Sequence, residues 1–138
     1  MLRRLALAVA WFTWTTAILA IVVPWNGFLD HTHWGKVGWI PFISPPIKIR
    51  DIVANLLLYV PFGYLGRRSI GGRLSARSVV ILAALLSFGT EATQLYSHWR
   101  FPSATDFTCN LLGTFSGIYF AQASSRAVRD TISQERQS

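Results

Sequence analysis

Four apolar runs constrain the fold of this chain more than any other feature, and they lie at residues 5–23, 51–66, 78–96 and 106–121. The first and third approach the roughly 20 residues that a helix needs to cross a bilayer. Hydrophobic residues make up 51% of the 138 residues, which is more than one small water-soluble core can bury. We therefore predict a single all-α domain over residues 1–138, a polytopic membrane protein built as a four-transmembrane-helix bundle.

The distribution of lysine and arginine orients this bundle. Nine arginines fall at the N-terminus, between the second and third runs, and in the C-terminal segment, whereas the other two connections hold four basic residues. Because basic residues concentrate on the cytoplasmic side, we predict cytoplasmic termini and external connections. A cleaved signal peptide is the alternative for the first run. Its length and the absence of a small-x-small cleavage site before Pro24 favour a retained helix.

The connection from Pro24 to Arg50 is rich in tryptophan, proline and glycine. Pro41, Pro45 and Pro46 exclude a continuous helix, because proline removes a backbone donor and clashes with the preceding turn. The tryptophans are untypical of a solvated, disordered linker. We therefore predict an external loop that lies on the membrane surface.

Metal binding and nucleic-acid binding are both disfavoured. Asp30, His31 and His33 resemble a metal site, but two histidines one residue apart without a second ligand pair are a weak zinc pattern. The net charge of +7 arises from basic residues between apolar runs, not from one basic face suited to phosphates. Cys109 lies inside an apolar run and is interpreted as a small apolar residue. We predict no metal and no cofactor.

Polar side chains recur in three of the four runs, near the end that the predicted topology places outside. They are Asp51 and Asn55 in the second run, Glu91 and Gln94 in the third, and Asp106 and Asn110 in the fourth. Arg100 lies in the adjoining loop. Ionisable groups inside a membrane are costly and mark functional sites by default. Their convergence predicts an outward-facing polar site.

Several of these residues also have a structural interpretation. Asp51 and Asp106 open their helices, and Ser103, three residues before Asp106, resembles the first residue of a capping box. Asn55 and Asn110 are suited to hydrogen bonds between helices. The structural and the functional interpretations both stay open for these aspartates and asparagines.

Glu91 is interpreted differently. It lies near the C-terminal, negative end of its predicted helix, where a carboxylate has no capping role. Two hypotheses follow: a structural ion pair with Arg100, or a role in the polar site.

Glycine and proline define the predicted scaffold. Gly113 and Gly117 form a GxxxG pair on the face that also carries Asp106 and Asn110, which predicts a close helix contact. Pro61 is expected to kink the second helix and to free a backbone carbonyl.

Three motifs resemble the VanZ-like family of small bacterial membrane proteins, over about residues 51–120. They are N-L-L-L-Y-V-P-F-G from Asn55 to Gly63, E-x-x-Q at Glu91 and Gln94, and R-x5-D-x3-N-x2-G-x3-G from Arg100 to Gly117. Ser103 and Thr105 stand where the family pattern often has further aspartates. The resemblance implies a multi-pass protein of the bacterial inner membrane, in a family named for low-level resistance to the glycopeptide teicoplanin. It also implies a characteristic polar set of Asn55, Glu91, Gln94, Arg100, Asp106 and Asn110.

Three functions are compatible with these features. The first is a non-enzymatic cell-envelope protein whose polar set binds an envelope lipid headgroup or a peptidoglycan-related ligand. The second is a membrane enzyme acting on a lipid-linked substrate, with Glu91 as general base and Asp106 as an orienting carboxylate. The third is a small transporter, which would need to form a homo-oligomer because the chain is short and has no inverted repeat.

Overall fold

The computed structural model describes residues 2–44, 48–69 and 74–136. The described helices are α1 (Leu2–Val22), the short 3-10 helix η1 (Trp34–Lys36), α2 (Ile49–Ser69), α3 (Ala76–Gln94) and α4 (Ala104–Glu135). The prediction of an all-α fold is confirmed for these residues, which hold isolated β-bridges but no strand. Some residues used in the sequence interpretation lie outside the described part: Pro45, Pro46 and Arg73.

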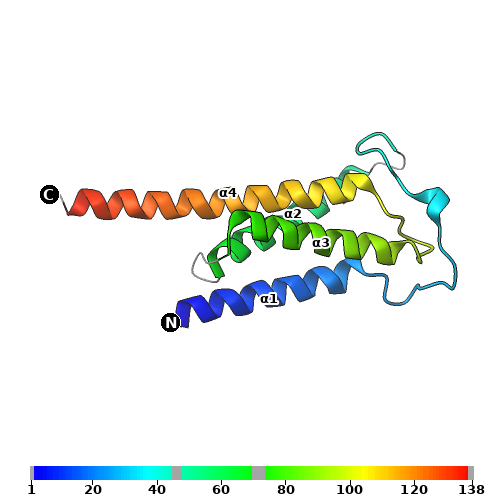
Figure 1. Cartoon of the computed structure of the whole chain (residues 1–138), viewed down its shortest axis with the longest axis horizontal. Coiled ribbons are helices and arrows are strands. Elements are labelled where there is room, and N and C mark those ends of the chain that lie inside the picture. Colours follow the sequence, from blue (N-terminus) through cyan, green and yellow to red (C-terminus); the bar gives the residue numbers. More distant parts are fainter. Residues whose placement is uncertain (1, 45–47, 70–73, 137–138) are drawn as a thin grey trace.

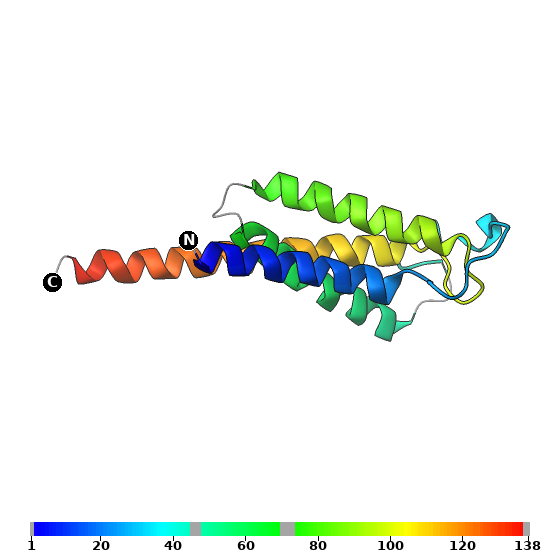
Figure 2. The ribbon, with the colours of Figure 1, turned by 90° about the horizontal axis from the view of Figure 1, so that it is seen from below.

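The helices lie lengthwise beside one another (Figures 1 and 2). α2 contacts each of the other three helices, and its pairing with α4 is the most extensive. Both chain termini lie at one end of the bundle, which we call the terminal end (Figure 1). At the opposite end, which we call the loop end, lie the connections 23–44 and 95–103.

Helix α4 continues to Glu135, well beyond the predicted end of the fourth run at residue 121. No glycine or proline follows Gly117, and alanine, arginine and glutamine in this segment favour helix. The last turns of α4 therefore project past the rest of the bundle at the terminal end (Figure 2).

Glycines bring α2 and α4 into backbone contact. A Cβ atom placed on Gly63, Gly113 or Gly117 would collide with the backbone of the opposite helix, and at Gly117 the obstacle is the Val60 carbonyl. Only glycine allows so close an approach of two helices. The prediction that the Gly113 and Gly117 face is a helix contact is confirmed.

The apolar core lies where α1, α2, α3 and α4 meet, and it consists of Ile18, Val22, Tyr59, Phe62, Val79, Ala83 and Ile118. The ring of Trp11 packs on Phe62, with 5.4 Å between ring centroids. Pro61 lies inside α2, and the helix continues on both sides of it. Three residues earlier, the Leu58 carbonyl accepts a hydrogen bond of 2.8 Å from Trp14 Nε1. The tryptophans of α1 thus pack the first helix against α2.

Large apolar side chains also cover outward faces of the helices. Phe12 is 75% exposed, Phe88 67% and Tyr119 67%. By length and composition, α1 and α3 are apolar enough to cross a membrane. α2 begins and ends with charged residues, and the second half of α4 is polar. Four spans therefore stay a prediction, whereas two membrane-compatible helices are observed.

The two connections at the loop end are joined by backbone hydrogen bonds. Gly38 N donates to Pro102 O at 2.9 Å, and Ala104 N donates to Gly38 O at 2.8 Å. Leu29 N donates to Tyr96 O at 2.8 Å. The described part of the first connection contains no α-helix, as its prolines predict. The sequence did not predict that this connection folds onto the start of α4.

Candidate functional site at the loop end

A cavity of about 110 Å³ lies between the start of α2, the end of α3 and the start of α4. We call it the loop-end pocket. Its charged lining residues are Lys36, Lys48, Asp51, Arg100 and Asp106. Its amide and hydroxyl groups come from Gln94, Ser44, Ser103 and Thr105, and its apolar walls from Ile52, Trp99, Phe101 and Pro102.

Glu91 is buried between α3 and α4, and only 8% of its surface is exposed. Its Oε2 atom accepts a hydrogen bond of 2.7 Å from the backbone amide of Ser103. Ser103 is the N-cap of α4, so Glu91 satisfies one of the free amides at the start of that helix. The prediction that Glu91 has no capping role is wrong. The carboxylate caps the next helix, whose positive end favours it, rather than its own.

Asp106 does not accept the hydrogen bond of the Ser103 amide, although its position three residues after Ser103 is compatible with that capping role. In a capping box, the acidic residue three positions after the cap accepts the hydrogen bond of the cap amide. Here the Ser103 hydroxyl accepts from Thr105 N at 3.2 Å, but the Ser103 amide bonds to Glu91. The capping box therefore does not form, because the Ser103 hydroxyl bonds to the amide two positions on rather than three. The half-buried Asp106 lines the loop-end pocket instead.

Gln94 lines the same pocket from the end of α3 and is 1% exposed. Neither its Oε1 nor its Nε2 has a hydrogen-bond partner within the described residues. A buried polar group without a partner costs roughly 1–3 kcal/mol, so native structures contain few of them. Gln94 therefore presents an uncompensated amide at the wall of the pocket.

Comparison with known protein families gives a match that covers most of the chain. A model of the family described as VanZ/LLP1 matches residues 5–125. The chain belongs to the VanZ/LLP1 family. The resemblance inferred from residues 51–120 is thus confirmed, and the match extends it through α1. No curated protein and no solved structure matches the chain.

The polar residues implied by the VanZ/LLP1 resemblance occupy two different places in the structure. Gln94, Arg100 and Asp106 line the loop-end pocket. The other three members are buried in the bundle and do not line it: Asn55, Glu91 and Asn110. Of the two candidate catalytic carboxylates, Asp106 therefore lies at the pocket, whereas Glu91 is occupied by the start of α4.

Asn110 is an interhelical contact. Its Nδ2 donates a hydrogen bond of 2.8 Å to Ser87 Oγ, which joins α4 to α3. The structural interpretation of Asn110 is confirmed, although its Oδ1 has no partner in the described part of the chain.

Arg100 is half-buried and lines the pocket. In the part of the chain that the structure describes, the two ion pairs are His31 with Asp30 and Arg50 with Asp51. The hypothesised Glu91–Arg100 ion pair is therefore absent. Arg100 lines the pocket without a direct ion pair to Glu91.

Two basic residues of the loop-end pocket, Lys36 and Lys48, are not among the residues predicted from the sequence. Both line the pocket, and Lys36 Nζ also lies 4.6 Å from the centroid of the Phe101 ring. A signal was present, because only four basic residues occur in the predicted external connections and three of them converge here. Their convergence depends on the folded path of the first connection, which the residue order does not reveal.

The histidines form a separate cluster at the loop end. His98 joins the two histidines of the first connection, with ring centroids 5.5 Å from His33 and 6.2 Å from His31. His31 Nδ1 lies 2.8 Å from Asp30 Oδ1, and this hydrogen bond lowers the pKa of the Asp30 carboxyl. Within the described residues, no group of three histidine, cysteine or acidic side chains has the arrangement of a metal site.

Proposed function

We propose that this VanZ/LLP1 protein is a multi-pass protein of the bacterial inner membrane whose loop-end pocket faces outward and binds a polar group of an envelope ligand. Two features support the membrane placement: the membrane-compatible helices α1 and α3, and the exposed aromatic side chains on helix faces. The arginines near both termini support a cytoplasmic terminal end.

The buried amide of Gln94 is the observation that carries the ligand-binding proposal. A side chain 1% exposed, with both amide atoms unpartnered, lies at the wall of a pocket that also presents Arg100 and Asp106. A capping or packing role does not account for an amide with no hydrogen bond in the described residues. A ligand that accepts from Nε2 and donates to Oε1 would satisfy it.

The charges of the pocket define the class of ligand. Three cationic side chains, Lys36, Lys48 and Arg100, face two carboxylates, Asp51 and Asp106. Such mixed charge suits a zwitterionic group, with its anionic part on the basic residues and its ammonium on the carboxylates. The volume of about 110 Å³ is below the usual range for whole small molecules. The pocket therefore holds one terminal group, such as phosphoethanolamine or the amino-acid end of a peptidoglycan stem peptide.

The ligand is tested with purified full-length protein. Binding of a peptidoglycan disaccharide-peptide and of dispersed phosphatidylethanolamine is measured by calorimetry for the wild type, Asp106→Asn and Gln94→Leu. Asp30→Asn is the matched control, because Asp30 is exposed and lies outside the pocket. We expect binding of one of the two probes by the wild type and the control, and a loss of about tenfold or more in both pocket variants. Equal affinities in all four proteins would overturn the proposal.

Because the family is named for teicoplanin resistance, sensitivity to teicoplanin is the phenotype to test in cells. A deletion strain is assayed for teicoplanin sensitivity and envelope composition, and is complemented with the wild type, Asp106→Asn or Asp30→Asn. We expect the pocket variant to fail at normal membrane abundance and the control to complement. Full complementation by Asp106→Asn would separate the phenotype from the pocket.

A further inference from the structure

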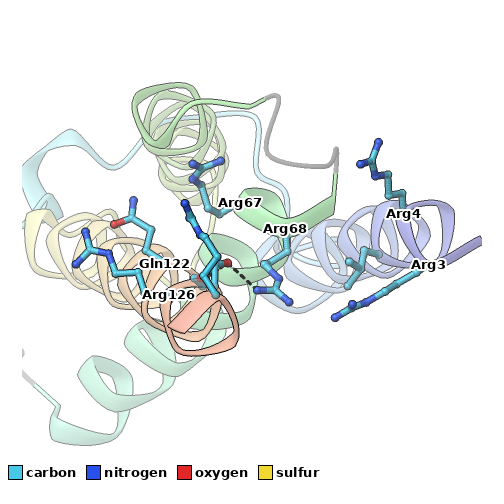
Figure 3. Close-up of a pocket in the computed structure, with 10 residues that line it drawn as sticks. Arg3, Arg4, Arg67, Arg68, Gln122 and Arg126 are labelled. Carbon is cyan, nitrogen blue, oxygen red and sulfur yellow. Dashed lines mark hydrogen bonds between the residues drawn. The ribbon is translucent and has the colours of Figure 1, made fainter. Parts of the chain in front are cut away.

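A second cavity, of about 450 Å³, lies at the terminal end of the bundle. It is formed by the start of α1, the end of α2 and the middle of α4 (Figure 3). We call it the terminal-end pocket. Six arginines line it: Arg3, Arg4, Arg67, Arg68, Arg126 and Arg129.

Two of these arginines are positioned by the protein itself. Arg68 Nη1 donates a hydrogen bond of 2.9 Å to Ser125 Oγ, drawn as the dashed line in Figure 3, and its guanidinium lies 5.8 Å from the centroid of the Tyr64 ring. Arg67 Nη1 donates to Leu74 O at 3.0 Å. Both side chains are half-buried, so the inner wall of the pocket presents ordered cationic groups.

No acidic residue lines this pocket in the part of the chain that the structure describes. The two ion pairs of the described residues both lie at the loop end or the start of α2. Six like charges around one cavity repel one another, and the described lining residues include no carboxylate that would offset this repulsion. The planar guanidinium group binds phosphate in a bidentate fashion, which makes a phosphate-bearing anion the matching partner.

The position of the pocket favours a lipid as the source of that anion. Arg3 and Arg4 stand in the first turn of α1, which is apolar enough to cross a membrane. Arg67 and Arg68 stand in the last turn of α2. Basic residues at helix ends lie at the level of the lipid headgroups, and basic pockets between helices on the cytoplasmic side recognise anionic headgroups.

We propose that the terminal-end pocket is a binding site for an anionic lipid whose headgroup carries two phosphates. The cavity volume lies within the range of sites that enclose a whole small molecule, about 300–1,000 Å³, and therefore accommodates more than one phosphate group. Leu7 and Ala121 supply apolar contacts beside the arginines. The proposal rests on the membrane placement given above and is independent of the loop-end ligand.

Native mass spectrometry of the full-length protein in neutral detergent tests this site. The probes are cardiolipin with two phosphates, phosphatidylglycerol with one, zwitterionic phosphatidylcholine, and inorganic pyrophosphate as a free competitor. The pocket variant is Arg4→Gln with Arg126→Gln, two exposed arginines that line the cavity. The matched control is Arg77→Gln with Arg136→Gln, which removes the same charge at the same end but outside the pocket.

We expect the wild type to retain cardiolipin more tightly than phosphatidylglycerol, and both more tightly than phosphatidylcholine. The pocket variant should weaken cardiolipin binding about tenfold or more, whereas the control double variant should change it less than about twofold. Asp106→Asn should leave it unchanged. Equal losses in both double variants would show a diffuse charge effect and overturn the site. Displacement of cardiolipin by an equal concentration of pyrophosphate would overturn the lipid as its ligand.

Discussion

The two ends of the bundle present polar groups in opposite ways. The loop-end pocket is small and mixed in charge, and it is backed by a buried amide and a buried carboxylate. The terminal-end pocket is about four times larger in volume, 450 Å³ against 110 Å³, and among the described residues its charged lining is arginine alone. At the loop end, two carboxylates in the pocket lining offset most of the charge of three basic side chains. At the terminal end the described lining holds no carboxylate, so we expect substitutions there to affect association. At the loop end we expect either folding or ligand binding to change, according to whether the carboxylate caps α4 or lines the pocket.

The largest effect is expected at the helix contact that supports both pockets. Gly117→Ala places a methyl group against the Val60 carbonyl and should lower the free energy of unfolding by about 3 kcal/mol. Gly89→Ala is the control, since a Cβ there meets nothing within 4 Å, and alanine should stabilise α3 by about 0.5–1 kcal/mol. Thermal unfolding in detergent measures both. Similar melting temperatures for the two variants would contradict the close contact of α2 and α4.

A smaller loss is expected when the carboxylate beneath the loop-end pocket is removed. Glu91→Ala leaves the Ser103 amide without its partner and should lower the free energy of unfolding by about 2 kcal/mol. Glu91→Gln retains an acceptor oxygen and should lose about half as much. Denaturant unfolding and hydrogen exchange at the Ser103 amide provide the measurement. An unfolding free energy unchanged in Glu91→Ala would return Glu91 to the list of functional candidates.

Asp106→Asn should weaken ligand binding and leave stability nearly unchanged, because Asp106 lines the pocket and does not accept the hydrogen bond of the Ser103 amide. We expect a change in unfolding free energy within about 0.5 kcal/mol, the usual range away from buried interactions. Ligand binding should weaken about tenfold, which corresponds to about 1.4 kcal/mol. If Asp106→Asn destabilised the protein as much as Glu91→Ala, the exchange of roles between the two carboxylates would be wrong.

The smallest effect on stability is expected at the terminal end. In neutral detergent at low salt, Arg4→Gln with Arg126→Gln removes repulsion between like charges and should raise stability by about 0.5 kcal/mol or less. At about 1 M salt the gain should disappear, because the screening length falls to about 3 Å. Melting temperatures at the two salt concentrations give the result. A loss of stability at both concentrations would mean that these arginines hold the helices together.

Local sequence predicted where the helices lie, but it did not predict which carboxylate caps α4. The apolar runs predicted the helices, and the GxxxG pair predicted the contact of α4. The same reasoning offered capping as one of two interpretations of Asp106, whereas in the structure Glu91 accepts the hydrogen bond of the cap amide. The position of Ser103 at the start of a helix predicts that its backbone amide is free. The acceptor of that amide, Glu91, comes from another helix. The distance between α3 and the start of α4 decides which carboxylate reaches it.

The sequence by itself determined the helical class, the glycine-lined contact, and the segregation of basic residues toward the terminal end. These properties follow from hydropathy, side-chain size and charge counted along the chain. Only the tertiary structure decided that Lys36 and Lys48 join Gln94, Arg100 and Asp106 in one pocket, because the first connection is bonded onto the start of α4. It also decided that Glu91 is part of the scaffold. A buried carboxylate takes the role set by the nearest unsatisfied donor, and in this fold that donor is the Ser103 amide.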